Sequence, residues 1–144
     1  MPLRLLIVDD DAAFRRTIGA VLSDRGYRIV GEAGSVADAR VAISALAPDA
    51  LLLDINLPDG NGLAFATELQ AGAGSPRVLL TSTDAGAAPP RLLARSGASF
   101  IAKADLLVTD LRVKSRDVVY DLSAVIVGVR PRQLRPLGAQ PPPV

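Results

Sequence analysis

The segment 50–54 constrains this chain most, because four consecutive apolar residues end in one carboxylate. Residues 50–53 show no alternation of polar and apolar side chains, which predicts a strand covered on both faces, as in a parallel α/β sheet. Asp54 ends the run and precedes a loop rich in Asn, Pro, Asp and Gly. Because parallel α/β sheets bind ligands beyond the carboxyl ends of their strands, the run predicts a functional site at Asp54.

The same pattern recurs through the first 110 residues. Strand-like runs cover residues 3–8, 27–31, 77–80 and 99–102, and helix-like segments cover 12–25, 36–47, 62–71, 91–96 and 106–114. Asp11, Ser35 and Asp105 stand at candidate N-cap positions. Pro89 and Pro90 restrict the residues before them, so the fourth helix should start late and be short. Strands and helices alternate five times, which predicts a parallel α/β sheet.

Polar residues follow four of the predicted strands. Asp9 and Asp10 follow the first strand, Asp54 ends the third, Thr81 follows the fourth and Lys103 follows the fifth. Carboxylates gathered at one sheet edge repel one another unless a cation joins them, and hard oxygen ligands favour magnesium. Lys is a point-charge phosphate binder. A nucleophilic carboxylate beside magnesium, a hydroxyl and a Lys are the parts of an aspartyl-phosphate site.

Each of these residues also has a structural interpretation. Asp9 and Asp10 precede a helix, whose dipole favours negative charge at its start, while Thr81 and Lys103 could simply end strands. Asp11 is expected to act only as a helix cap. An Asp-x-Asp motif also occurs in haloacid-dehalogenase-type phosphohydrolases, but that family places its nucleophile after the first strand and needs a cap domain. The five positions taken together favour the phosphoryl site.

In the order and spacing of these motifs, residues 3–110 resemble the receiver domain of two-component response regulators. Ala104 and Asp105 follow Lys103 where many members of that family carry Pro, which is closer to the nitrate-regulator branch of LuxR-type transcription factors. The resemblance implies a flavodoxin-like, doubly wound, five-stranded parallel sheet of order 2-1-3-4-5 with helices on both faces. It also implies a module that accepts a phosphoryl group from a sensor histidine kinase or phosphotransfer protein and catalyses only its own phosphorylation and dephosphorylation.

The resemblance assigns a metal site and a switch. It implies that Asp54 accepts the phosphoryl group, that Asp10, Asp54 and the Asn56 carbonyl hold Mg²⁺, and that Asp9 supports the metal through water. The remaining roles fall on the last two strands: Lys103 and Thr81 contact the phosphoryl oxygens, and Thr81 and Phe100 form the switch. An aromatic residue on a strand is as often a core residue, so both interpretations of Phe100 stay open.

The composition excludes several chemistries. The chain has no Cys and no His, which removes thiol catalysis, His-based triads and the usual zinc sites. Because it has no His, its phosphoryl donor must be another protein or a small molecule. No apolar run approaches the roughly 18 residues of a membrane span, and no signal peptide is recognisable, so a cytoplasmic location is expected.

The C-terminal part differs from the rest in composition. Residues 1–110 carry 10 Lys or Arg and 13 Asp or Glu, whereas residues 111–144 carry 6 and 2. We expect a receiver domain over 1–116, an apolar extension over 117–130 that docks on its own domain or on a second copy, and a Pro-rich flexible tail over 131–144. No helix-turn-helix fits in this stretch, so contact with nucleic acid is not expected from this chain alone.

Two other functions stay open at this stage. The chain could be the receiver part of a DNA-binding transcriptional regulator whose output domain is truncated or missing. It could also be a receiver-like protein-interaction module that is never phosphorylated.

Overall fold

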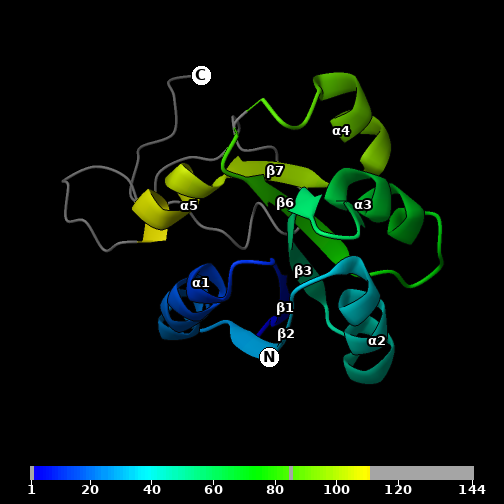
Figure 1. Cartoon of the computed structure of the whole chain (residues 1–144). Coiled ribbons are helices and arrows are strands. Elements are labelled where there is room, and N and C mark those ends of the chain that lie inside the picture. The colour runs from blue at the N-terminus through cyan, green and yellow to red at the C-terminus, as the bar shows by residue number, and fades with distance from the viewer. Residues whose placement is uncertain (1, 85, 111–144) are drawn as a thin grey trace, which may run out of the picture.

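A five-stranded parallel sheet forms the centre of the computed structural model, which describes residues 2–84 and 86–110 (Figure 1). The strand order is β2-β1-β3-β6-β7, and every neighbouring pair is parallel. This is the predicted 2-1-3-4-5 order, because the two remaining strands form a separate hairpin. The strands of the large sheet are β1 (Arg4–Val8), β2 (Arg28–Ala33), β3 (Ala50–Asp54), β6 (Arg77–Ser82) and β7 (Ser99–Ala102).

Helices cover both faces of the sheet, as predicted. Alternate strand residues point to opposite faces, so the core divides into two clusters. Leu5 and Ile7 pack with Phe14 and Ile18 in one cluster, while Leu6 and Val8 belong to the other. The first cluster lies under α1 (Ala12–Asp24) and α5 (Lys103–Asp110), and the second lies under α2 (Val36–Leu46), α3 (Gly62–Gln70) and α4 (Pro90–Ser96).

Side-chain caps fix the starts of three helices. Asp11 accepts hydrogen bonds from the backbone N–H groups of Ala13 and Phe14 at 3.0 and 3.1 Å, which confirms its prediction as the cap of α1. Ser35 caps α2, also as predicted. Asn61 caps α3, a role that was not predicted. Each cap satisfies N–H groups that have no partner within the helix.

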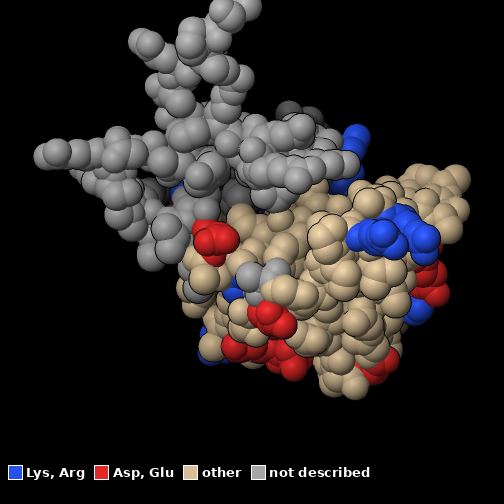
Figure 2. Space-filling view, turned by 90° about the horizontal axis from the view of Figure 1, so that it is seen from above, with Lys and Arg blue, Asp and Glu red and all other residues tan. Residues whose placement is uncertain are grey.

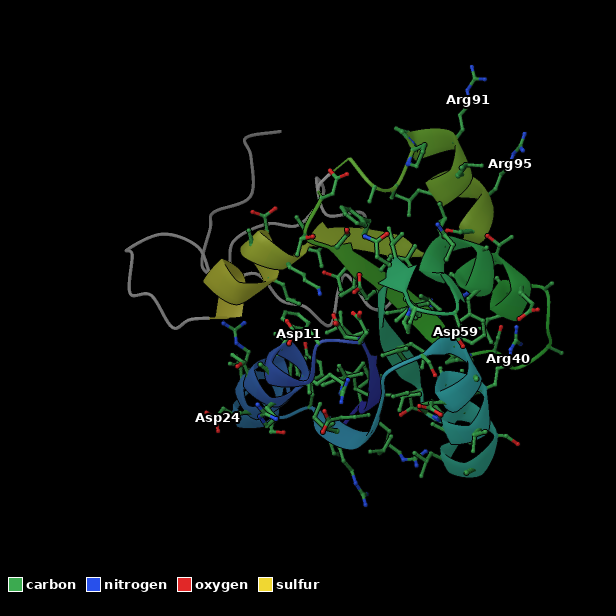
Figure 3. The ribbon with its side chains drawn as sticks, in the orientation of Figure 1. Asp11, Asp24, Arg40, Asp59, Arg91 and Arg95 are labelled. Atoms are coloured by element: carbon green, nitrogen blue, oxygen red, sulfur yellow. The ribbon has the colours of Figure 1, made fainter. Side chains whose placement is uncertain are left out.

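A short antiparallel hairpin, β4 (Asn56–Leu57) and β5 (Gly60–Asn61), follows β3 and was not predicted. Asp59, in its turn, accepts hydrogen bonds from the N–H groups of Val36 and Ala37 at 2.7 and 3.0 Å. The hairpin therefore ties the loop after Asp54 to the start of α2, and Figure 3 shows Asp59 beside that helix.

The last two helices begin differently from one another. Pro90 occupies the first turn of α4 and Gly97, at φ 69°, ends the helix, so the short fourth helix is confirmed. The prediction for α5 was wrong at its start. Strand β7 runs directly into α5 at Lys103, and Asp105 lies within the first turn instead of capping it.

Arg91 and Arg95 extend from α4 away from the body of the molecule (Figure 3).

The C-terminal predictions fall mostly outside the described residues. The extension 117–130 and the tail 131–144 both lie beyond residue 110, the last one described. Among the residues that are described, no helix is both long enough and apolar enough to span a membrane.

Candidate functional site

Parallel strand register brings the predicted residues to one edge of the sheet. Asp54 and Thr81 are paired neighbours at the ends of β3 and β6. Asp9 directly follows β1, and its N–H bonds to the carbonyl of Ala33 at the end of β2 at 2.9 Å. Figure 2 looks down on the molecule from above and shows several acidic side chains toward the lower left of the described surface, apart from a basic group at its upper right.

Three carboxylates converge at this edge. Oxygens of Asp9, Asp10 and Asp54 lie within 4.8 Å of one another. Asp9 and Asp54 are 1% and 4% exposed, whereas Asp10 is exposed. A set of hard oxygen donors with one side open to solvent fits Mg²⁺, which takes one or two carboxylates and keeps several waters.

Lys103 lies between the two buried carboxylates. Its Nζ is 2.6 Å from Asp9 Oδ2 and 3.4 Å from Asp54 Oδ2, so it holds Asp9 more closely. The same Nζ lies 4.4 Å from the centre of the Phe14 ring. Lys103 is therefore held by an acid on one side and an aromatic ring on another.

The charges of the pocket shift two pKa values. Burial and the nearby charge of Asp9 raise the pKa of Asp54 above its ordinary value, against the opposing effects of the Asn56 N–H and Lys103. Burial alone would lower the pKa of Lys103, but its hydrogen bond to Asp9 and the charges of both acids outweigh burial and raise it. The ammonium form of Lys103 is thus favoured, whereas burial and Asp9 disfavour the charged form of Asp54, which a further cation would stabilise.

Thr81 carries a hydroxyl that has no hydrogen-bond partner in the described part of the chain. Its Oγ1 is buried and makes no hydrogen bond to any described residue. Ser82, next to it, accepts hydrogen bonds from the N–H of Asp84 at 3.1 Å and from the Asn56 side chain at 3.4 Å. A buried polar group without a partner costs free energy, and a phosphoryl oxygen on Asp54 would supply one.

Two predicted residues lie at the margin of this arrangement. Asn56 donates its backbone N–H to Asp54 Oδ1 at 3.2 Å, and its role as a carbonyl ligand stays a prediction. Phe100 is half-buried on β7, beside Leu80 of β6, and packs against the core cluster under α2, α3 and α4. Its role in the switch also stays a prediction.

The sequence missed other residues that shape the site. A Cβ on Gly62 would lie 2.2 Å from the Asp54 carbonyl oxygen, so only glycine lets α3 begin this close to the backbone of Asp54. Arg15 donates from Nη1 to the carbonyl of Asp9 and from Nε to Glu32 at 3.0 Å. Nothing in the local sequence distinguishes these residues from an ordinary loop glycine and a solvated helical arginine.

The comparisons with known proteins agree with this geometry. Residues 5–112 match the response regulator receiver domain family. The chain is 43% identical over 82 residues to protein-glutamate methylesterase/protein-glutamine glutaminase 1 of Rhizobium johnstonii, covering 56% of this chain and 24% of that protein. It is 33% identical over 117 residues to the DNA-binding transcriptional activator DevR/DosR of Mycobacterium tuberculosis, covering 81% of this chain and 54% of that protein.

Solved structures show the same fold. A LuxR-family two-component response regulator from Aurantimonas superposes with a TM-score of 0.71 at 24% identity, covering 90% of this chain and 89% of that one. The response regulator domain of Thermotoga maritima CheB gives a TM-score of 0.62 at 32% identity, covering 72% and 79%. The family match spans most of the chain, and the strand order and the acidic pocket agree with it. The chain therefore belongs to the response regulator receiver domain family.

Proposed function

We propose that Asp54 is the phosphoryl acceptor of this receiver domain. The carboxylate attacks the phosphorus of a phosphohistidine in a sensor histidine kinase or phosphotransfer protein, and the phosphorus–nitrogen bond of the donor breaks as the new phosphorus–oxygen bond forms. The observation that carries the proposal is the meeting of three groups at one sheet edge: buried Asp54, the Lys103 ammonium 3.4 Å away, and the unpartnered hydroxyl of Thr81.

Each group has a part in the transfer. Lys103 offsets charge on the phosphoryl oxygens, and Thr81 donates its hydroxyl to one of them. Asp10, Asp54 and the Asn56 carbonyl would hold Mg²⁺, with Asp9 acting through water. When bound, the ion would supply positive charge that offsets part of the negative charge of the carboxylates and of the phosphoryl group.

The phosphorylated state would then shift a conformational equilibrium. Once Thr81 turns to the phosphoryl group, the space around it changes, and Phe100 adjusts on the neighbouring strand. The surface formed by α4, β7 and α5 carries the signal. A ligand shifts such an equilibrium only as far as it binds one state better, and the hydroxyl bond to phosphate supplies that difference.

A cytoplasmic location stays a prediction.

Labelling with a small phosphodonor tests the proposal. Incubated with acetyl phosphate and Mg²⁺, the protein should gain one base-labile phosphoryl group, measured by intact mass. Asp54→Asn should abolish the gain. Asp24→Asn makes the same chemical change at the end of α1, away from the pocket (Figure 3), and should label normally. Equal labelling of Asp54→Asn would overturn the assignment of the acceptor, whereas no labelling of the wild type would favour an interaction module that is never phosphorylated.

A second candidate, the receiver part of a DNA-binding transcriptional activator, is favoured by one observation. The match to DevR/DosR extends over 81% of this chain, whereas the match to the methylesterase covers 56%. Its test is the coding sequence on either side of this chain. A helix-turn-helix in frame would support the candidate, and a methylesterase domain in frame would contradict it.

A further inference from the structure

The ring of Phe14 faces the ammonium group at the centre of the site. Lys103 Nζ lies 4.4 Å from the ring centre, well inside the distance of about 6 Å at which a cation is attracted to an aromatic face. Phe14 is 9% exposed, so little water screens the contact. The two residues come from the start of α1 and the start of α5, which cover the same face of the sheet.

We propose that Phe14 is a positioning residue for Lys103: the face of its ring restrains the ammonium beside Asp9 and Asp54 so that it meets the incoming phosphoryl group. This inference rests on the proposed function of Asp54. The ring carries no lone pair and no formal charge. It therefore holds the ammonium without taking the place of the carboxylate and phosphoryl oxygens as acceptors.

The position of Lys103 explains why such a restraint matters. Its Nζ lies nearer Asp9, at 2.6 Å, than Asp54, at 3.4 Å. Lys has a flexible four-carbon stem. The two carboxylates restrain Nζ only on the side of the ammonium that faces them. The ring restrains it from another direction, which raises the fraction of time that the ammonium spends where transfer needs it.

Graded fluorination of the ring separates this electrostatic role from packing. Fluorine atoms withdraw charge from the ring face while changing its size little. Mono-, di- and trifluorophenylalanine placed at position 14 should lower the rate of phosphorylation by acetyl phosphate step by step, at a nearly constant melting temperature. Phe14→Leu, which keeps an apolar side chain without a ring, should lower the rate by about 3- to 10-fold.

Phe65 provides the matched control. Its ring lies 4.9 Å from the guanidinium carbon of Arg40, a contact between α2 and α3. The same fluorinated residues at position 65 should leave the phosphorylation rate unchanged.

The outcomes distinguish this inference from the proposed function. Normal labelling of the wild type with a flat fluorination series at position 14 overturns the role of Phe14 alone. If each added fluorine lowers the phosphorylation rate equally at positions 14 and 65, the role of Phe14 is overturned as well, because the effect would not depend on the contact with Lys103. If the wild type takes up no phosphoryl group at all, the proposed function fails and this inference fails with it.

Discussion

Asp54 is a buried carboxylate whose charge is only partly compensated. Burial and the charge of Asp9 both disfavour its ionised form, and the Lys103 ammonium is closer to Asp9 than to Asp54. The pocket therefore holds more negative than positive charge in a place where water offers little screening. A divalent cation would offset the excess negative charge of the carboxylates. A phosphoryl oxygen on Asp54 would accept a hydrogen bond from the Thr81 hydroxyl.

Replacing Lys103 tests whether its ammonium competes with a metal. Lys103→Met keeps an unbranched side chain against Phe14 but leaves two buried acids without a cation. Stability without Mg²⁺ should fall by about 1–3 kcal/mol, less than for a fully buried pair because Lys103 keeps some contact with solvent. Millimolar Mg²⁺ should then raise the melting temperature of this variant more than that of the wild type.

A companion variant checks that the effect comes from the acidic site. Asp10→Ala removes an exposed carboxylate of the cluster, so it should weaken the response to Mg²⁺ with little loss of stability in its absence. Equal Mg²⁺ shifts in the wild type, Lys103→Met and Asp10→Ala would show that the pocket is not a metal site.

Gly62 should tolerate no side chain. A Cβ there meets the Asp54 carbonyl oxygen at 2.2 Å and the Ile55 Cα at 2.9 Å, and both are backbone atoms that cannot turn away. Gly62→Ala should cost about 1–3 kcal/mol or more and slow phosphorylation, because the loop that carries the acceptor must move. Gly72→Ala, whose Cβ would meet only the Leu69 carbonyl at 3.5 Å, is the control. Equal losses in the free energy of unfolding for Gly62→Ala and Gly72→Ala, measured by urea denaturation, would contradict this view.

At the scale of elements, the start of α2 depends on a side chain from a different loop. Ser35 caps the helix with a neutral hydroxyl that accepts from the N–H of Asp38 at 3.1 Å. Asp59 adds a carboxylate that accepts from Val36 and Ala37. The hydrogen bonds from Ala37 and Val36 lower the pKa of Asp59 below its ordinary value. The hairpin after Asp54 is thereby held to α2.

This cap should give the protein a measurable acid sensitivity. A lowered pKa in the folded state means that the stabilisation by Asp59 is complete above the unfolded value of about 3.9. It is then lost as the pH falls through the folded value. Melting temperatures of the wild type and Asp59→Asn should therefore differ at pH 7 and converge as the pH falls below about 4.

Ser35→Ala is the matched control for that measurement. It removes an uncharged cap from the same helix, so its cost of about 1 kcal/mol should not change with pH. A gap between the wild type and Asp59→Asn that stays constant down to acid pH would show that the charge of Asp59 does not act on α2.

The sequence predicts those elements whose cause is local. Uniform apolar runs mark the inner strands, and Asp11 and Ser35 mark helix starts because capping needs only a few neighbouring residues. The start of α5 was missed because β7 leads into it without a loop, and Lys103 is held there by Asp9, Asp54 and Phe14 from distant parts of the chain. The hairpin after Asp54 was missed because its two strands have only two residues each.

The candidate site divides in the same way, into residues that the sequence predicts and residues that it misses. The predicted site residues lie at or just after strand ends, and parallel pairing alone brings strand ends together, so the sequence indicated their meeting. They are Asp9, Asp10, Asp54, Thr81 and Lys103. The contact of Phe14 with Lys103 depends on how two helices pack over the sheet, and periodicity could identify Phe14 only as a core residue. The need for glycine at position 62 depends on the approach of two backbones, which has no signature in composition.

At the scale of the whole molecule, the site lies at one edge of the sheet that separates the two core clusters. Strand residues of β1 and β6 alternate between the cluster under α1 and α5 and the cluster under α2, α3 and α4. Lys103 begins α5 on one face, while Phe100 packs on the other. Lys103 contacts Asp54 directly, and Phe100 pairs with Leu80, the strand neighbour of Thr81. We therefore expect a change at Asp54 and Thr81 to reach both faces.

Truncation tests the proposed division of the C-terminal part. Burying the Val, Leu and Ile side chains of residues 118–129 is worth roughly 1.5–3 kcal/mol each, so we expect this extension to dock on its own domain or on a second copy. Truncation after Arg116 should lower the melting temperature or turn a dimer into a monomer, and truncation after Arg130 should change little. Unchanged melting temperature and solution mass per particle after truncation at Arg116, which removes the apolar stretch, would contradict docking.

The most direct test of the central claim is to locate the phosphoryl group on the chain. Borohydride reduces an aspartyl phosphate to homoserine, which marks the acceptor permanently. After treatment with acetyl phosphate and Mg²⁺ followed by borohydride, peptide mass spectrometry should find homoserine at position 54 and aspartate at positions 9 and 10. Homoserine at another position, or none in a protein that has gained the phosphoryl mass, would contradict the account.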